Sequence, residues 1–326
     1  MPLPSRLSCF GSLLLAAALA PGLAAPPAST LPDHCDILRG MPLTLLDFSG
    51  SGPEAPGSGQ SDTNSKVASL QLGASMKLAF AAAGGNPGLA DECWGAVDSL
   101  FAHQTKAGDF GTAPASAAVS LCELGRSLLV IQQSPLADSF KNRIEALKPA
   151  IAKATRWLTK QQSRLLWEDR ASPDRLFAEA EAFLFCGRVL GDDALLRIGQ
   201  QFLDKGMKAY RPADGVFLEN NGADPSYEAT SLVRLQEIVL HFPDRSIEKS
   251  IASGVQWELA HINADGTVHS DAKQHSFFGS KMLMAPEKQA NVGEVALALL
   301  YYHQRTGDPA ALAAVERLHR HYTSPH

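Results

Sequence analysis

Apolar residues recur at helical spacing along most of the chain beyond residue 64. Representative runs are Ile144, Leu147 and Ile151, and Leu232, Leu235 and Val239. A repeat of three to four residues places these side chains on one face of a helix, so the pattern predicts amphipathic helices. The alternation typical of strands is confined to short pieces around residues 215–218 and 267–269. The chain is therefore expected to be all-α.

Turn signals divide this helical region into ten segments. The expected helices are 64–82, 88–103, 115–133, 136–162, 173–190, 193–209, 226–242, 245–261, 291–306 and 309–322. Three of the turns share a pattern in which Gly or Pro ends one helix and Asp begins its partner: Gly191-Asp192, Pro243-Asp244 and Gly307-Asp308. These turns pair the helices into hairpins.

Helical hairpins that repeat at about 50 residues predict an α/α toroid, as an incomplete or closed barrel of five to six hairpins. An open α-solenoid is the competing fold. The long, irregular connections between the hairpins favour the toroid, because solenoid repeats usually keep their loops short and uniform. The toroid domain is expected to span residues 64–326.

The first 24 residues have the pattern of a signal peptide. Arg6 precedes an apolar stretch from Leu13 to Ala20, and the small residues Gly22 and Ala24 occupy cleavage-determining positions. The stretch is shorter than the roughly 18 apolar residues of a membrane span, which favours cleavage over anchoring. Residues 25–63 are expected to form an N-terminal arm and linker. The leader predicts a periplasmic or secreted protein with no stable membrane insertion after cleavage.

Composition and charge narrow the class of partner. The chain has 326 residues, 45% of them hydrophobic and 19% charged, which is typical of a globular protein. Lys and Arg number 29 against 34 Asp and Glu, a net charge of −5. The basic field that accompanies nucleic-acid binding is missing, so nucleic acid is excluded as a partner. The same charge is an argument against an enzyme that degrades polyanions, because such enzymes usually need a basic cleft.

Four cysteines follow the leader: Cys35, Cys93, Cys122 and Cys186. In an oxidising compartment they would be able to form two bridges, in one of three connectivities. Cys122 and Cys186 lie in apolar helical stretches, which is equally typical of buried free thiols. The sequence therefore assigns no pairing, and the cysteine spacing fits no zinc motif.

The segment from Asp214 to Glu228, DGVFLENNGADPSYE, is the strongest candidate for chemistry. Asp224 suits an N-cap, which places Tyr227 in the first helical turn, where the helix dipole favours a phenolate able to transfer a proton. Asn220 and Asn221 are suited to donate hydrogen bonds to a substrate carboxylate, which makes the proton on the neighbouring carbon more acidic. Together they predict proton abstraction followed by elimination. The alternative is a buried tyrosine at a helix start beside turn asparagines.

This segment resembles the heparinase and alginate-lyase-like polysaccharide lyases, which are α/α toroids. The resemblance rests on Asp214-Gly215, Glu219 and Ser226-Tyr227 before an amphipathic helix. It implies that the tyrosine acts as acid or base and that an asparagine or histidine holds the uronate carboxylate. Many of those enzymes have a histidine directly after the tyrosine, where this chain has Glu228.

A second candidate region is the long loop 262–291, which carries His269, Asp271, His275 and Lys281. Long ordered loops are often functional. His269 or His275 would supply the missing base or carboxylate ligand, because histidine titrates near neutral pH. A metal site of His269, Asp271 and His275 is disfavoured, since the spacing matches no helical ligand pair. No metal or cofactor is therefore expected.

Four further residues are candidates for substrate binding. Trp167 lies in an expected loop and is suited to stack against a sugar, and Lys281 and Glu219 are polar residues of the two candidate segments. Arg234 follows Tyr227 on the same helix face, where it would hold an anionic substrate or form an ordinary ion pair with Glu237.

These observations predict a carbohydrate-active protein that acts on a polysaccharide or oligosaccharide. The favoured function is a polysaccharide lyase that cleaves a uronate-containing glycan by β-elimination. One alternative is an inverting glycoside hydrolase that uses two carboxylates from Glu219, Asp224 and Glu228. The other alternative is a non-catalytic glycan-binding envelope protein, which the negative net charge supports.

Overall fold

The computed structural model describes residues 33–46, 63–220, 222–269, 277–278, 281–282 and 290–324, with side chains only outside 63–72, 277–278 and 281–282. They belong to one compact unit, Pro32–His326. The expected leader, residues 1–24, lies outside the described residues.

Ten of the twelve α-helices in the described part of the chain match the expected segments within two residues at each end. The helices are α1 (His34–Gly40), α2 (Thr63–Ala83), α3 (Pro87–Ala102), α4 (Pro114–Gln133), α5 (Ala137–Lys160), α6 (Gln162–Glu168), α7 (Pro173–Leu190), α8 (Asp193–Met207), α9 (Pro225–His241), α10 (Arg245–Ala260), α11 (Val292–Thr306) and α12 (Pro309–Thr323). The sequence pattern did not predict α1, α6 or the 3-10 helix η1 (Leu43–Leu46). Two short antiparallel pairs complete the fold, β1 (Tyr210–Arg211) with β2 (Val216–Phe217) and β3 (Phe277–Phe278) with β4 (Lys281–Met282).

Side-chain caps explain why the helices begin where they do. Four aspartates accept hydrogen bonds from backbone N–H groups of the first helical turn: Asp192, Asp224, Asp244 and Asp308. Gly191 and Gly307 follow the last residues of α7 and α11 with φ of 70° and 75°, a conformation that favours glycine. The turn signals therefore act as helix boundaries.

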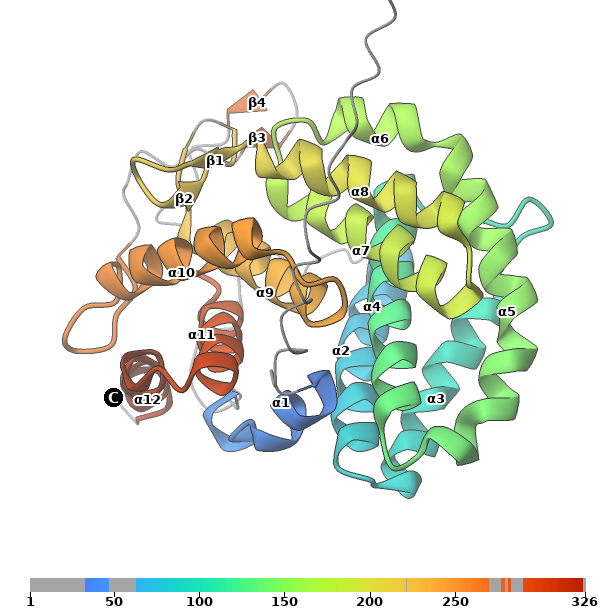
Figure 1. The fold of residues 1–326 in the computed structure, drawn as a ribbon, viewed down its shortest axis with the longest axis horizontal. Helices are drawn as coiled ribbons and strands as arrows, with labels where there is room; N and C mark the ends of the chain where they lie inside the picture. Colours follow the sequence, from blue (N-terminus) through green and yellow to red (C-terminus); the bar gives the residue numbers. More distant parts are fainter. Residues whose placement is uncertain are drawn as a thin grey trace, which may run out of the picture. The chain divides into compact units, whose positions relative to one another are not determined.

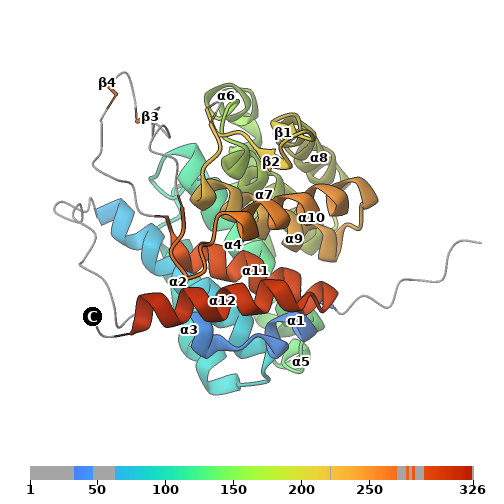
Figure 2. The same cartoon turned by 90° about the vertical axis from the view of Figure 1, so that its left-hand side faces the viewer.

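The helices form an α/α toroid of five hairpins, as the sequence predicted. Figure 1 shows the inner helices α2, α4, α7, α9 and α11, and each is followed by its outer partner, α3, α5, α8, α10 or α12. Each inner helix packs against the next one, and Figure 2 shows α10 and α12 outside α9 and α11. The inner helices run parallel. The Asn291 N–H donates to Ser226 Oγ at 2.8 Å where α9 and α11 begin, and the Tyr301 hydroxyl donates to Glu237 at 2.9 Å further along both helices.

Helix α1 packs against α2, α4, α9 and α11, and so joins the first and last inner helices of the toroid (Figure 1). Cys35 Sγ donates to Val130 O at 3.5 Å, and Arg39 Nε donates to Ala83 O at 3.1 Å. Ala83 is the last residue of α2, and Val130 lies in the last turn of α4. Helix α1 therefore covers the end of the toroid at which the inner helices finish, although the sequence placed these residues in an arm.

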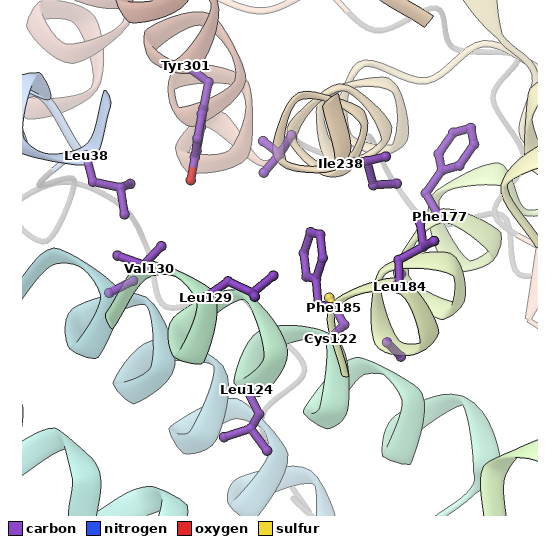
Figure 3. Packing of buried hydrophobic residues seen from close by; sticks show 14 of the residues in the cluster. Leu38, Cys122, Leu124, Leu129, Val130, Phe177, Leu184, Phe185, Ile238 and Tyr301 are labelled. Carbon is purple, nitrogen blue, oxygen red and sulfur yellow. The ribbon is translucent and has the colours of Figure 1, made fainter. Parts of the chain in front are cut away.

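Apolar side chains from five helices meet inside the toroid. Figure 3 shows Leu38, Val130, Phe185, Ile238 and Tyr301 pointing toward one another, and all are buried. Helix α4 is long and apolar enough to cross a membrane, but most of it is buried in this core between α2 and α7. It is therefore the core helix of the toroid.

Two buried arginines lie among carboxylates of the inner helices. Arg126 pairs with Glu123 and, at 3.2 Å, with Glu237. Arg234 pairs with Glu123 at 2.7 Å and with Glu181 at 3.1 Å. These ion pairs connect α4, α7 and α9 across the inner layer.

The four cysteines that the structure describes, Cys35, Cys93, Cys122 and Cys186, are buried free thiols. Cys122 Sγ donates to Glu181 at 2.9 Å. Burial raises the pKa of the Cys186 thiol to about 12, so this thiol is protonated and unreactive at neutral pH. Of the two possibilities for these cysteines, the structure shows the buried thiols.

A directed chain of hydrogen bonds connects α1 to the buried carboxylate of Glu237. Because the Tyr301 hydroxyl donates to Glu237, its oxygen accepts from His34 Nε2 at 2.9 Å. His34 Nδ1 then accepts from His241 Nε2 at 3.1 Å. Burial and the charge of Arg126 lower the pKa of His34 to about 3, so the imidazole is neutral in this chain.

A buried carboxyl pair joins α9 to α10 behind β2. Glu228 Oε2 accepts the Phe217 N–H at 2.8 Å, and Glu258 is fully buried beside Glu228. Burial raises the pKa of Glu228 to about 8. Burial, together with the negative charges of Glu228 and Asp224, raises the pKa of Glu258 well above its ordinary value. Both carboxyl groups are therefore protonated at neutral pH.

We predict that His34→Ala lowers the free energy of unfolding by about 3 kcal/mol, because it removes two buried hydrogen bonds and leaves a cavity under α1. Urea denaturation followed by circular dichroism measures the change. His103, which is exposed at the end of α3, offers a matched control, and His103→Ala is expected to shift stability by no more than about 0.5 kcal/mol. Equal effects of the two substitutions would contradict the role of His34.

We also predict that Glu228→Gln stabilises the protein at alkaline pH. The folded chain holds a proton on Glu228 that the unfolded chain loses near pH 4.5, so stability falls by about 1.4 kcal/mol per unit as the pH rises from there toward 8. Glutamine cannot ionise, so the variant is expected to exceed the wild type by about 4 kcal/mol at pH 8 and by about 1 kcal/mol at pH 5. Thermal and urea unfolding at both pH values measure the difference. The exposed Glu316 provides the control, and a Glu316→Gln variant with the same gain would disprove the assignment.

Candidate functional site

The end of the toroid opposite α1 is the one where α7, α9 and α11 begin. Thr230 in the second turn of α9 donates to Glu294 in the first turn of α11 at 2.6 Å. The backbone N–H of Asn220 donates to Ala171 O, just before α7, at 2.9 Å. The segment 214–228 is thus held between the beginnings of α7 and α9. We refer to this region as the mouth, defined by residues 167–175, 219–220, 224–230 and 291–294.

The hairpin of β1 and β2 positions the candidate segment. Gly215 makes the turn with φ of 73°, a conformation that favours glycine. Val216 pairs with Arg211, and Phe217 is buried against Phe177 of α7. Because Phe217 packs β2 against the core, Glu219 and Asn220, which follow β2 closely in the sequence, lie at the mouth.

Asn220 is held in an unusual backbone conformation. Its φ of 48° is in the left-handed region, and it is the sole non-glycine residue with positive φ among those the structure describes. Such conformations cost free energy and are concentrated at functional sites. The side chain is exposed, and its Nδ2 donates to Glu219 Oε1 at 3.0 Å. The amide is therefore presented to solvent in a fixed position.

Glu219 is partly buried and bonds to the beginning of α7. Its Oε1 also accepts from Ser172 Oγ at 2.7 Å. Burial, followed by the negative charge of Asp174, raises the pKa of Glu219 to about 8. Burial also raises the pKa of Asp174. At neutral pH Glu219 therefore carries a proton that it shares with Asp174.

A second carboxyl pair lies deeper at the beginning of α7. Burial, followed by the charge of Asp169, raises the pKa of Glu179 to about 10. Asp169 is itself buried and accepts from Arg175 Nη1 at 3.0 Å. Glu179 is thus neutral, while Asp169 and Arg175 form an ion pair.

Trp167 lies at the end of α6 with 67% of its surface exposed. The guanidinium of Arg170 lies 4.3 Å from the indole centroid, and its Nη1 donates to Trp167 O at 2.7 Å. Ala171, which follows Arg170, accepts the Asn220 N–H. The backbone of Asn220 is therefore joined to the segment that carries an exposed aromatic ring and a cation, side chains of the kind that bind an acidic sugar.

Tyr227 lies in the first turn of α9, as the sequence predicted. Asp224 is the N-cap and accepts the N–H groups of Ser226 at 2.8 Å and Tyr227 at 3.4 Å. Tyr227 is partly exposed, whereas Glu228, which follows it, is only 1% exposed. The structure therefore brings Trp167, Glu219, Asn220 and Tyr227 to the same end of the toroid.

The other predicted residues lie elsewhere or outside the described residues. His269 is exposed, its N–H donates to His261 O at 2.7 Å, and its ring lies 6.5 Å from the His261 ring, which places it at the end of α10. Asn221, Asp271, His275 and the side chain of Lys281 lie outside the described residues.

Arg234 lies inside the toroid, below the mouth. Its side chain is 11% exposed, and its guanidinium lies among Glu123, Glu181 and Glu237, the last at 3.8 Å. Of the two roles weighed for Arg234, the structure shows the ion pair.

Sequence reasoning missed the polar group at the beginning of α7, which consists of Ser172, Asp174, Arg175 and Glu179. A signal was present, because Glu179 and Glu181 interrupt the apolar run from Leu176 to Phe185. A carboxylate in an otherwise buried helix face indicates either a paired or a protonated group. Within the described ranges, no group of three or more His, Cys, Asp or Glu side chains is arranged to hold a metal ion.

Comparison with known proteins shows that the fold of this chain is similar to that of solved polysaccharide lyases. No family model matches the sequence, and no curated protein matches it. A solved polysaccharide lyase matches with a TM-score of 0.52 and 12% identity, over 87% of this chain and 81% of its own. The Streptomyces coelicolor A3 chondroitin AC lyase, in complex with chondroitin sulphate, matches with a TM-score of 0.49 and 14% identity, over 94% of this chain and 47% of its own. The chain thus spans about half the length of that lyase. At these identities the likeness is one of fold, and in its all-α toroid the chain resembles polysaccharide lyases.

Proposed function

We propose that the protein is a polysaccharide lyase that cleaves a uronate-containing glycan by β-elimination. The observation that carries the proposal is the exposed, left-handed Asn220 on the same short segment as Tyr227, in a toroid shared with a polysaccharide lyase. Asparagine is the residue type that binds a carboxylate without a charge, and tyrosine is able to transfer a proton.

In the proposed reaction, the Asn220 amide donates a hydrogen bond to the carboxyl group of the uronate. This bond stabilises the negative charge that develops when the proton on the neighbouring carbon is removed. The Tyr227 phenolate takes that proton, and the electron pair forms a carbon–carbon double bond while the glycosidic C–O bond breaks. The leaving sugar oxygen then receives the proton from Tyr227, which restores the phenolate.

Two cations lie near Asn220 despite the net charge of −5. Arg170 and Arg175 offset the carboxylates of Asp169 and Asp174, and Glu219 is protonated, although the mouth also contains Glu168, Asp224 and Glu294. The amino-terminal ends of α7, α9 and α11 add partial positive charge. Trp167 offers a stacking face for a sugar ring. His269, His275 and Lys281 remain sequence predictions for this site.

An inverting glycoside hydrolase is the second candidate, and one observation favours it. Glu219 keeps its proton up to about pH 8 and is partly exposed at the mouth, as a general acid must be. The two remaining carboxylates are less suited to activate a water, since Glu228 is buried and protonated and Asp224 caps α9. The lyase is therefore the better supported function.

We predict that Tyr227→Phe lowers the turnover number by about 10³-fold without unfolding the protein, because it removes the group that transfers the proton. The assay follows the ultraviolet absorbance of the unsaturated product on a panel of uronate polysaccharides, beside a reducing-end assay. Tyr322→Phe on the outer helix α12 is the matched control and is expected to retain wild-type activity.

The two assays distinguish the functions. An increase in ultraviolet absorbance with the wild type, but not with Tyr227→Phe, supports the lyase. Reducing ends without absorbance would indicate the hydrolase. No product in either assay across the panel would favour a non-catalytic binding protein. A fully active Tyr227→Phe variant would disprove the role of Tyr227.

We further propose that the protein is exported to the periplasm or the medium. The support is the leader pattern of Arg6 followed by the apolar stretch Leu13–Ala20. When the chain is expressed from Met1, amino-terminal sequencing of the mature protein is expected to begin close to residue 25. A variant without Leu13–Ala20 is expected to stay in the cytoplasm. An intracellular protein that retains Met1 would contradict export.

A further inference from the structure

The side chain of Glu219 touches the Asn220 amide rather than pointing freely into the mouth. Its Oε1 accepts two hydrogen bonds, from Asn220 Nδ2 at 3.0 Å and from Ser172 Oγ at 2.7 Å. Its other oxygen is buried on the side of Asp174. Glu219 therefore fixes the rotation of the Asn220 amide relative to α7, and one N–H of Nδ2 remains to bind a ligand.

The same contact places two acidic groups close together when a uronate is bound. A carboxylate that accepts the second N–H of Asn220 Nδ2 lies about 3 Å from this nitrogen. Since Glu219 Oε1 is 3.0 Å from the same nitrogen, the two carboxyl groups approach to within about 6 Å. At that distance an ionised Glu219 would repel the ligand, whereas a protonated Glu219 would not.

Acidic side chains outnumber the cations around Glu219. Asp174 and Arg175 face it from the first turn of α7, and Arg175 is paired with Asp169 at the end of α6 at 3.0 Å. Glu294 faces the same cluster from the first turn of α11, where it accepts from Thr230. Ionisation of Glu219 would therefore add a negative charge to a group that already contains Asp174 and Glu294.

We propose that Glu219 is a positioning residue, which orients the Asn220 amide and must be protonated when a free uronate carboxylate binds there. The proposal rests on the lyase function proposed above and replaces the direct substrate contact expected for Glu219 from the sequence. It also defines a specificity. A free uronate is bound only while Glu219 is neutral, whereas a methyl-esterified uronate, which has no charge at this position, is bound in either state.

Kinetics on a matched pair of substrates test this proposal. The substrates are one uronate oligosaccharide in its free form and the same oligosaccharide as its methyl ester, each assayed from pH 6 to pH 10. For the wild type, we expect kcat/KM on the free form to fall about tenfold or more above pH 8, where Glu219 loses its proton. On the ester, kcat/KM is expected to lack this fall.

Glu219→Gln keeps the hydrogen-bonding shape without the ionisable proton. The variant is expected to lose the alkaline fall on the free form, so that its kcat/KM at pH 9.5 exceeds that of the wild type by about fivefold or more. Glu316→Gln is the matched control, since Glu316 is an exposed carboxylate on the outer helix α12, away from the mouth, and it is expected to follow the wild-type profile. An unchanged alkaline fall in Glu219→Gln would overturn the proposal.

A measurement that needs no turnover separates this inference from the proposed function. In full-length protein labelled with ¹⁵N-asparagine, the Nδ2 signals of Asn220 are identified by their loss in Asn220→Asp. We expect these signals to move with a midpoint near pH 8 in the wild type and in Glu316→Gln, and to stay fixed in Glu219→Gln. If the Nδ2 signals of the wild type do not change with pH, the positioning role is overturned, even if the protein is an active lyase. If these signals change with pH but the protein shows no activity in any assay, the positioning of Asn220 is upheld and the lyase function is rejected.

Discussion

The buried ion pairs of Arg126 and Arg234 are the constraint on which the toroid depends. Two cations inside a protein are tolerated only if carboxylates surround them, because an unpaired buried charge costs several kcal/mol. Here the carboxylates come from Glu123 on α4, Glu181 on α7 and Glu237 on α9. The inner helices therefore have to keep one register, since sliding one of them by a turn would leave a charge without a partner.

The same network holds α1 over one end of the toroid. Glu237 accepts a hydrogen bond from Tyr301, and through Tyr301 and His34 it fixes α1 across the ends of α9 and α11. The beginnings of α7, α9 and α11 lie at the opposite end. The partial positive charges of these helix ends and the Asn220 amide lie there, together with the acidic side chains of Asp174 and Glu294.

Several buried carboxyl groups in this structure hold a proton at neutral pH. Burial raises the pKa of Glu228 and of Glu219 to about 8 and of Glu179 to about 10. Formal counting at neutral pH treats each of these groups as a negative charge, whereas in the folded chain they are neutral. The formal net charge of −5 therefore overstates the negative charge of the folded chain. This weakens the argument from charge against an acidic substrate.

The sequence by itself determined the ten main helices, their ends and the pairing into hairpins, because these features depend on local periodicity and on caps such as Asp224 and Gly191. It also placed Tyr227 in a first helical turn. It did not predict α1, a seven-residue helix that is stable only through its contacts with four inner helices. Nor could it join Ser172 to Glu219, which lie 47 residues apart, or reveal which carboxyl groups hold a proton. Those properties were decided by the tertiary structure, because proton affinity depends on burial and on neighbouring charges that only the folded chain brings together.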